Sequence, residues 1–134
     1  MSALKPGMVH EEEMVVEERH TARHLRGEGV TVLATPVMAA LMEGAARNLA
    51  DPMLEPGYMT VGTEISIKHL AATPQGRRVR ARAELVGIEG RKLHFKVEVF
   101  DDKGKVGEGT HTRAIVNLRR FWDKLQTRTD IGLA

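Results

Sequence analysis

The sequence predicts one α+β domain, in which a curved antiparallel sheet wraps around a single long central helix. Three observations support this fold class. Residues 35–50 repeat apolar side chains at helical spacing around most of the circumference, which is typical of a largely buried helix. Four later segments alternate apolar and polar residues between short turns, as antiparallel strands do. The 134 residues accommodate one ordinary domain, so the strands themselves must cover the helix.

The chain before the helix is interpreted as extended. Residues 8–25 carry a few apolar side chains among many charges, and an edge strand is expected around residues 13–18. Residues 1–7 and 127–134 are expected to be the loosely ordered ends of a single domain that spans residues 1–134.

The central helix is expected to begin at Thr35. Threonine is a good N-cap, and Pro36 has a φ angle that suits the first helical position. Asp51 and Pro52 are expected to end the helix.

The remaining elements follow the alternation of apolar residues. In the first strand after the helix, one face is expected to carry Val61, Thr63, Ile65, Ile67 and His69. The expected strands cover residues 61–70, 78–88, 93–99 and 106–118, and residues 119–126 are expected to form a short terminal helix.

Composition excludes several classes of function. The chain has no cysteine, which excludes a thiol nucleophile, a disulfide and a thiolate metal site. No apolar run approaches the roughly 20 residues that span a bilayer, and a signal-peptide apolar region is absent, so a cytoplasmic protein without a membrane partner is expected. The net charge is only +2 with scattered basic residues, so nucleic acid is not an expected partner.

Two features leave alternatives open. Arg78, Arg80 and Arg82 alternate with small apolar residues, and they form either a solvated strand face or a contact surface for the phosphates of a ligand. Glu43 lies in the middle of the apolar helix, where a carboxylate is either paired or functional because burying it alone is costly. The available pairing partner on the helix surface is Arg47, four residues later.

Thr35 and His69 also have structural interpretations, as a helix cap and as a hydrogen-bonded core histidine. His20 and His24 stand four residues apart, but the residues between them lack the glutamate of a metalloprotease helix. No metal site is therefore predicted.

Several motifs together resemble the fluoroacetyl-coenzyme A thioesterase family, over residues 10–125. No single motif is specific, but their order and spacing are. The motifs are Thr-Ala-Arg-His-Leu at 21–25, the stretch from Thr35 to Glu43, Val61-Gly62-Thr63, His69-Leu70-Ala71-Ala72-Thr73-Pro74, the pattern from Val79 to Arg91, and Gly109-Thr110-His111 with Arg113.

The resemblance implies a hot-dog fold and an obligate homodimer, which could pair into a tetramer, with joined sheets and active sites at the interface. It implies that Thr35, Glu43 and His69 are catalytic, that Gly62 and Arg113 line the substrate site, and that no cofactor is needed. The implied reaction is hydrolysis of a small or medium acyl-coenzyme A. Glu43 either attacks the thioester carbonyl or activates a water, with attack favoured by the resemblance.

Three departures from the family pattern affect the substrate. The loop between residues 25 and 35 is shorter and has no phenylalanine, so the aromatic lid is missing. Pro36 stands where the family has glycine and cannot donate an N–H, so Val37 or another backbone group is expected to donate to the substrate. Gly44 stands where the fluoroacetate enzyme has a bulky aromatic residue. The sequence therefore predicts a thioesterase without strict fluoroacetyl selectivity.

A non-catalytic module that binds or senses acyl-coenzyme A is the alternative function. A hot-dog hydratase is less favoured, because no Asp–His pair in a local overhang is found. The sequence leaves open the acyl group and whether coenzyme A or a carrier protein holds it.

Overall fold

The computed structural model describes residues 3–127 and 132–133. In chain order its elements are β1 (Val9–Val15), the 3₁₀ turn η1 (Glu18–His20), α1 (Ala22–Arg26), α2 (Thr35–Ala50), the 3₁₀ turn η2 (Asp51–Met53), β2 (Tyr58–His69), β3 (Arg78–Glu89), β4 (Lys92–Asp101), β5 (Gly104–Asn117) and α3 (Leu118–Thr127).

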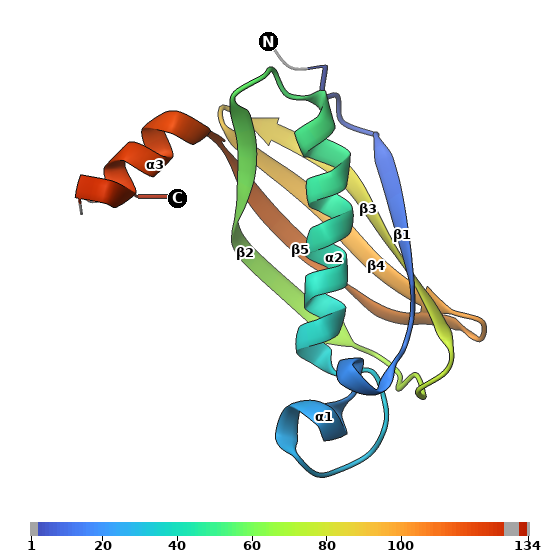
Figure 1. Cartoon of the computed structure of the whole chain (residues 1–134). Helices are drawn as coiled ribbons and strands as arrows, with labels where there is room; N and C mark the ends of the chain where they lie inside the picture. The colour runs from blue at the N-terminus through green and yellow to red at the C-terminus, as the bar shows by residue number, and fades with distance from the viewer. Residues whose placement is uncertain (1–2, 128–131, 134) are drawn as a thin grey trace.

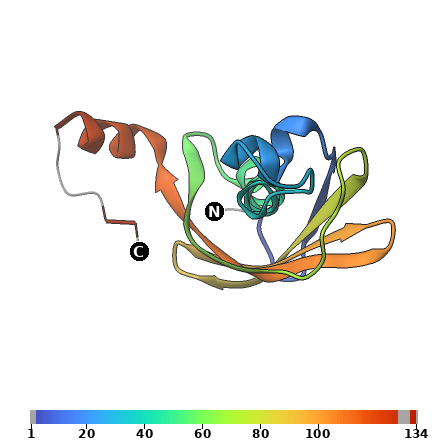
Figure 2. The same ribbon diagram turned by 90° about the horizontal axis from the view of Figure 1, so that it is seen from below.

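The five strands form one antiparallel sheet in the order β1-β3-β4-β5-β2. The sheet curves around α2, and Figure 2 shows the helix lying in its concave side. β1 and β2 are the two edges, and α3 projects away from the body of the domain beyond β2 (Figure 1). The expected α+β class and the hot-dog arrangement are confirmed.

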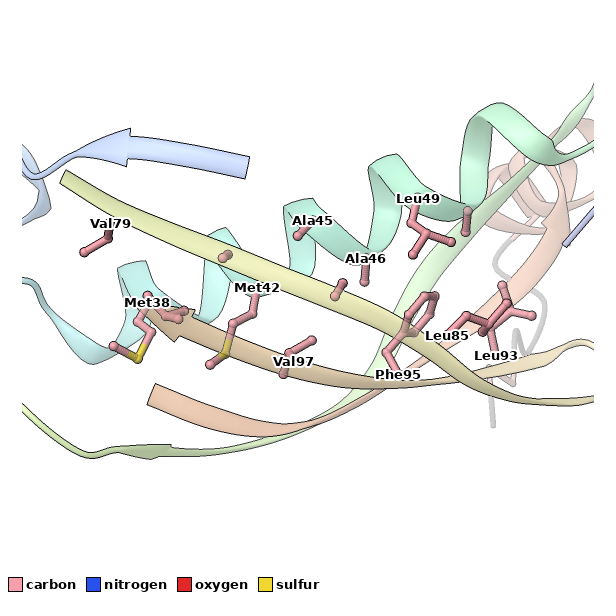
Figure 3. Packing of buried hydrophobic residues seen from close by; sticks show 14 of the residues in the cluster. Met38, Met42, Ala45, Ala46, Leu49, Val79, Leu85, Leu93, Phe95 and Val97 are labelled. Atoms are coloured by element: carbon pink, nitrogen blue, oxygen red, sulfur yellow. The ribbon is translucent and has the colours of Figure 1, made fainter. Parts of the chain in front are cut away.

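The core lies between α2 and the inner face of the sheet. One face of the helix is fully apolar and packs against apolar side chains of β3 and β4 (Figure 3). The helix contributes Met38, Met42, Ala45, Ala46 and Leu49, and the strands contribute Val79, Leu85, Leu93, Phe95 and Val97. Because alanines hold the middle of this face, the helix backbone approaches the sheet closely.

Residues 18–20 and 22–26 are helical, so the expectation that residues 8–25 are extended is wrong from residue 18 onward, except at Thr21. The Thr21 hydroxyl accepts a hydrogen bond from the His24 N–H and caps α1. Gly27 then ends α1 in the left-handed conformation, with φ of 80°. Local capping, which is invisible to apolar periodicity, decides this segment.

The start of α2 differs from the expectation by one residue. Ala34 is the N-cap, and its carbonyl accepts the first helical hydrogen bond from the Met38 N–H. Thr35 therefore lies inside the first turn, and its hydroxyl does not cap the helix. The expected cap role of Thr35 is wrong.

A bulge in β2 changes which residues face the helix. The register with β5 shifts between Gly62 and Glu64. Gly62 faces Glu43 on α2, and Ile65 beyond the bulge packs against the core. Strict alternation along the strand would place Gly62 and Ile65 on opposite faces. The extra residue in the bulge shifts the alternation, so both residues lie on the same face.

At the N-terminal end, Leu4 is buried and the Gly7 N–H donates to the Leu85 carbonyl, so the described part of residues 1–7 packs against the domain. Both ends of the chain were expected to be loosely ordered. Residues 1–2, 128–131 and 134 of these ends lie outside the described residues. The expected terminal helix is confirmed as α3.

The arginines of β3 form ion pairs with carboxylates, most of which lie on a neighbouring strand. Arg80 Nη1 lies 2.6 Å from Glu11 and Arg78 Nη1 lies 3.5 Å from Glu13, both on β1. These contacts support the interpretation of a solvated strand face.

Within residues 3–127 and 132–133, no helix combines the length and the apolar character that a membrane span requires.

The close approach of α2 to β5 depends on Gly107. A Cβ at this position would overlap the sulfur of Met38. We expect Gly107→Ala to lower the free energy of unfolding by about 1–3 kcal/mol through overpacking. Met38→Ala in the same chain should remove the clash, so the two substitutions together should cost less than the sum of their separate effects.

Urea titration of the four proteins of this double-mutant cycle measures the coupling. Gly44→Ala is the matched control, because its Cβ would meet only the Arg47 guanidinium at 3.7 Å and should raise helix stability. Strict additivity of the Gly107 and Met38 substitutions would contradict the packing described.

Candidate active site

The first turn of α2 brings two of the predicted residues together. The Thr35 hydroxyl lies 2.8 Å from Nδ1 of His69, the last residue of β2. Since Thr35 is not the cap, its hydroxyl is available to hold the imidazole ring. The Thr35–His69 pair therefore joins the N-terminal end of the helix to the C-terminal end of an edge strand.

The second nitrogen of His69 is unengaged. Nε2 is buried and has no hydrogen-bond partner in the described part of the chain. Burial lowers the pKa of His69, and the Ala71 carbonyl opposes this shift without reaching hydrogen-bond geometry at Nε2. The ring is therefore neutral near pH 7. A neutral imidazole that is fixed at one nitrogen and unpaired at the other can exchange a proton at the unpaired nitrogen.

A hollow of about 630 Å³ adjoins the Thr35–His69 pair. Its volume lies within the range of ligand pockets. One wall comes from α1 and the loop after it, and the residues around the pair are mainly apolar. The apolar lining includes Ala22, Leu25, Val32, Leu33 and Leu70. The hollow suits a small apolar group held next to His69.

Glu43 lies elsewhere on α2, with its carboxylate against β2. A Cβ added to Gly62 would lie 3.0 Å from Glu43 Oε2 and 3.3 Å from both Arg113 Nη1 and His111 Cε1. Three polar side chains therefore converge on Gly62, and a residue with a Cβ there would force them to move. No ion pair joins Glu43 to Arg47 among the described residues, so the carboxylate is not used in the surface pair that was considered.

Arg113 is buried and held in a fixed orientation. Its Nε donates to the Thr60 hydroxyl at 2.7 Å, and its Nη2 donates to the Thr60 carbonyl at 3.0 Å. The Thr60 hydroxyl in turn donates to Asp51 at 2.6 Å. The charges of Asp51 and Glu43 both act on this guanidinium and partly compensate the cost of burying it.

His111 completes this cluster as a neutral ring. Its Nδ1 lies 2.7 Å from the Glu64 carbonyl, and its Nε2 lies 3.2 Å from Arg113 Nη1. Because a carbonyl only accepts and a guanidinium only donates, the proton is on Nδ1. Burial lowers the pKa of His111 most, and the charge of Arg113 lowers it further, against the Glu64 carbonyl and the charge of Glu43.

One chain contains two separate clusters. Thr35 and Glu43 are eight residues apart on one helix, which is about 12 Å along its axis. The structure brings Thr35 and His69 together, and it brings Glu43, Gly62 and Arg113 together. It does not unite the two groups within one chain.

The Val37 N–H, which was expected to face the substrate, is already engaged. It donates to the Ala34 carbonyl at 3.1 Å within the first turn of α2. This bond weighs against a role for Val37 as a donor to a developing oxyanion.

Comparisons with known proteins identify the family of this chain. A family model described as fluoroacetyl-CoA-specific thioesterase matches residues 16–119. A fluoroacetyl-CoA thioesterase from Streptantibioticus cattleyicolor is 40% identical over 126 residues, which cover 90% of this chain and 91% of that protein. The chain belongs to the fluoroacetyl-CoA thioesterase family. It is a thioester hydrolase, as the resemblance implied.

Solved structures support the same family. A crystal structure of the fluoroacetyl-CoA thioesterase superimposes with a TM-score of 0.88 at 37% identity, covering 96% of this chain and 99% of that one. A thioesterase superfamily member from Thermus thermophilus gives 0.87 at 29% identity, covering 96% and 97%. The fold of this thioesterase family is therefore retained over nearly the whole chain.

Sequence reasoning missed the support of the Glu43 cluster. Asp51 was interpreted only as a helix end, Thr60 was given no role, and His111 was only part of a motif. In this thioesterase family member, Thr60 and His111 contact Arg113 directly, and Asp51 holds Thr60. The one available signal was the placement of Arg113 and His111 two residues apart on an inward face, since buried charged side chains need partners.

The neutral state of His111 predicts a pH dependence of stability. Its folded pKa is lowered, so the unfolded chain binds more protons below its own pKa of about 6.5, and stability falls as pH is lowered through that value. His69 contributes in the same direction. We expect the thermal midpoint to drop between pH 7.5 and 5.5, and to drop less in His111→Gln.

Thermal denaturation at pH 7.5 and pH 5.5 measures this change in stability. Both pH values lie above the range in which carboxylates ordinarily titrate. His94→Gln is the control, because the His94 side chain is 40% exposed. An equal drop in the wild type and in His111→Gln would contradict the assignment.

Proposed function

We propose that the protein hydrolyses a small or medium acyl-CoA to the free acid and CoA, in a homodimer whose active sites lie between the subunits. The observation that carries this proposal is the division of the catalytic residues along α2. A buried histidine nitrogen without a partner is costly, and a carboxylate two turns away cannot supply one within the same chain. A second subunit can bring the two groups together.

The sheet edges support this assembly. β1 is a short edge with three consecutive glutamates, which disfavours pairing with another strand. β2 is a free edge of 12 residues with half-buried apolar side chains. If two copies of β2 pair antiparallel about a two-fold axis near Ile65 and Ser66, Gly62 of one copy lies opposite His69 of the other. Glu43 then approaches the Thr35–His69 pair of the other copy.

The proposed chemistry follows from these positions. The thioester carbonyl lies near the N-terminal end of α2, where the helix dipole stabilises developing negative charge. The Glu43 carboxylate attacks the carbonyl carbon and the C–S bond breaks, which releases CoA as the thiolate and leaves a mixed anhydride. Neutral His69 takes a proton from the water that attacks this anhydride and passes the proton to the thiolate. Hydrolysis of the anhydride releases the acid and regenerates Glu43. Thr35 orients His69 through the hydrogen bond at Nδ1.

The alternative route uses Glu43 as a general base that takes a proton from water, which attacks the carbonyl directly. Arg113 supports either role, because its buried positive charge interacts with the Glu43 carboxylate.

The acyl group is proposed to lie in the apolar hollow beside His69. Because the loop after α1 carries no phenylalanine, no aromatic lid narrows this hollow. The hollow therefore supports acceptance of acyl groups larger than fluoroacetyl.

Glu43→Gln tests the proposal. The substitution keeps the shape of the side chain and removes its charge, so we expect kcat to fall by about 10²–10⁴-fold while the fold is retained. Thiol release is measured across a panel of acetyl-, fluoroacetyl-, butyryl- and hexanoyl-CoA, and the exposed Glu28→Gln is the control.

Full activity in a folded Glu43→Gln protein would overturn the mechanism. If the wild type releases no thiol from any member of the panel but is stabilised by CoA, the alternative function of a binding or sensing module is supported instead.

A further inference from the structure

Thr60 binds one complete edge of the Arg113 guanidinium. Its hydroxyl accepts a hydrogen bond from Arg113 Nε at 2.7 Å, and its carbonyl accepts one from Nη2 at 3.0 Å. The N–H groups of Nε and Nη2 on this edge point in the same direction, so a single residue engages both, as a carboxylate does in a bidentate pair. Because the guanidinium is planar and rigid, these two bonds fix its rotation as well as its position.

The hydroxyl proton of Thr60 is committed to Asp51. Thr60 Oγ1 donates to Asp51 Oδ1 at 2.6 Å, and the Thr60 backbone N–H donates to the same oxygen at 3.1 Å. A hydroxyl has a single proton, so the bond to Asp51 leaves the lone pairs of Oγ1 to accept from Arg113. Asp51 therefore sets the direction of the hydrogen bond that holds the guanidinium.

The other side of the guanidinium lies beside Glu43. Thr60 and Gly62 are two residues apart in the regular part of β2 before the bulge, so they share the face toward α2. A Cβ at Gly62 would lie 3.3 Å from Arg113 Nη1 and 3.0 Å from Glu43 Oε2. The edge that Thr60 holds thus determines where Nη1 stands relative to the carboxylate.

Asp51 also allows Arg113 to stay buried without consuming Glu43. Burial lowers the pKa of Arg113 most, and the charge of Asp51 opposes this shift more than the charge of Glu43 does. Among the described residues 3–127 and 132–133, Glu43 forms no ion pair with Arg113. The carboxylate is therefore close to a fixed positive charge but is not occupied by it.

We propose that Thr60 and Asp51 are positioning residues for thioester hydrolysis. Asp51 orients the Thr60 hydroxyl, Thr60 fixes Arg113, and Arg113 holds its charge beside the Glu43 carboxylate while leaving that carboxylate unpaired. The inference rests on the proposed function in taking Glu43 as the reacting group. Both residues act through Arg113, so their removal affects turnover more than substrate binding.

Thr60→Val tests this role, because valine keeps the branched shape and removes the hydroxyl. We expect kcat for the fastest substrate of the acyl-CoA panel to fall by about tenfold or more, with KM changed by less than about twofold. Thr60→Ser returns the hydroxyl and should return kcat to within about threefold of the wild-type value. Thr73→Val is the matched control. It removes an equally buried hydroxyl that donates to Asp101 at 2.9 Å, so it should lower stability without lowering kcat.

A spectroscopic readout reports the orientation of Arg113 without turnover. The NMR signal of the Arg113 Nε–H is assigned by its absence from the spectrum of Arg113→Lys. We expect this proton to exchange slowly with solvent in the wild type and in Thr60→Ser, and rapidly in Thr60→Val. Asp51→Ala should also lower kcat, whereas Asp51→Asn should lower it less, because its amide oxygen still accepts from Thr60.

Wild-type kcat in a folded Thr60→Val protein overturns the inference, and so does an equal loss of kcat in Thr73→Val. If Thr60→Val does not fold, the Asp51 variants decide, and wild-type kcat in Asp51→Ala overturns it. If Glu43→Gln is inactive and Thr60→Val is fully active, the proposed function stands and the inference fails. If Thr60→Val loses kcat while Glu43→Gln retains it, the positioning of Arg113 stands and the role proposed for Glu43 fails.

Discussion

The burial of α2 against the sheet is the constraint on which the rest of the structure depends. This helix supplies one side of the core and also carries both Thr35 and Glu43. Small residues let it lie close to the strands, and Gly62 and Gly107 are positions where a Cβ would meet side chains of the helix. The same close packing that stabilises the domain thus fixes a carboxylate next to a buried guanidinium.

The polar network beneath Glu43 explains how charges persist in this interior. Arg113 is satisfied by Thr60 on one side and by His111 on the other, and Asp51 holds Thr60. Removal of any one member would leave another polar group buried without a partner. By contrast, the Thr35–His69 pair leaves one ring nitrogen unsatisfied, which is the feature expected of a group that acts on a second molecule.

Much of the fold could be predicted from the sequence, because apolar periodicity reports directly on burial. α2, the later strands and α3 were predicted to within a few residues. The helical turns at 18–26 could not, because the hydroxyl of Thr21 and the backbone freedom of Gly27 decide them locally. The bulge at Gly62 was also invisible, since alternation assumes an unbroken register.

The candidate site was predicted residue by residue through family resemblance, but its arrangement was not. Sequence motifs show no contacts between elements, so they could not reveal that Thr35 meets His69 while Glu43 lies against Gly62 and Arg113. Nor could they show that the Val37 N–H is engaged within the helix.

The central claim is that each active site combines Glu43 of one subunit with the Thr35–His69 pair of the other. Co-expression of Glu43→Gln and His69→Ala chains tests it most directly, because a heterodimer then contains one complete site. Each variant alone should be inactive. If half of the dimers are heterodimers, and one of the two sites in each heterodimer is intact, activity should recover to about a quarter of the wild-type value. No recovery in purified heterodimers would contradict the account.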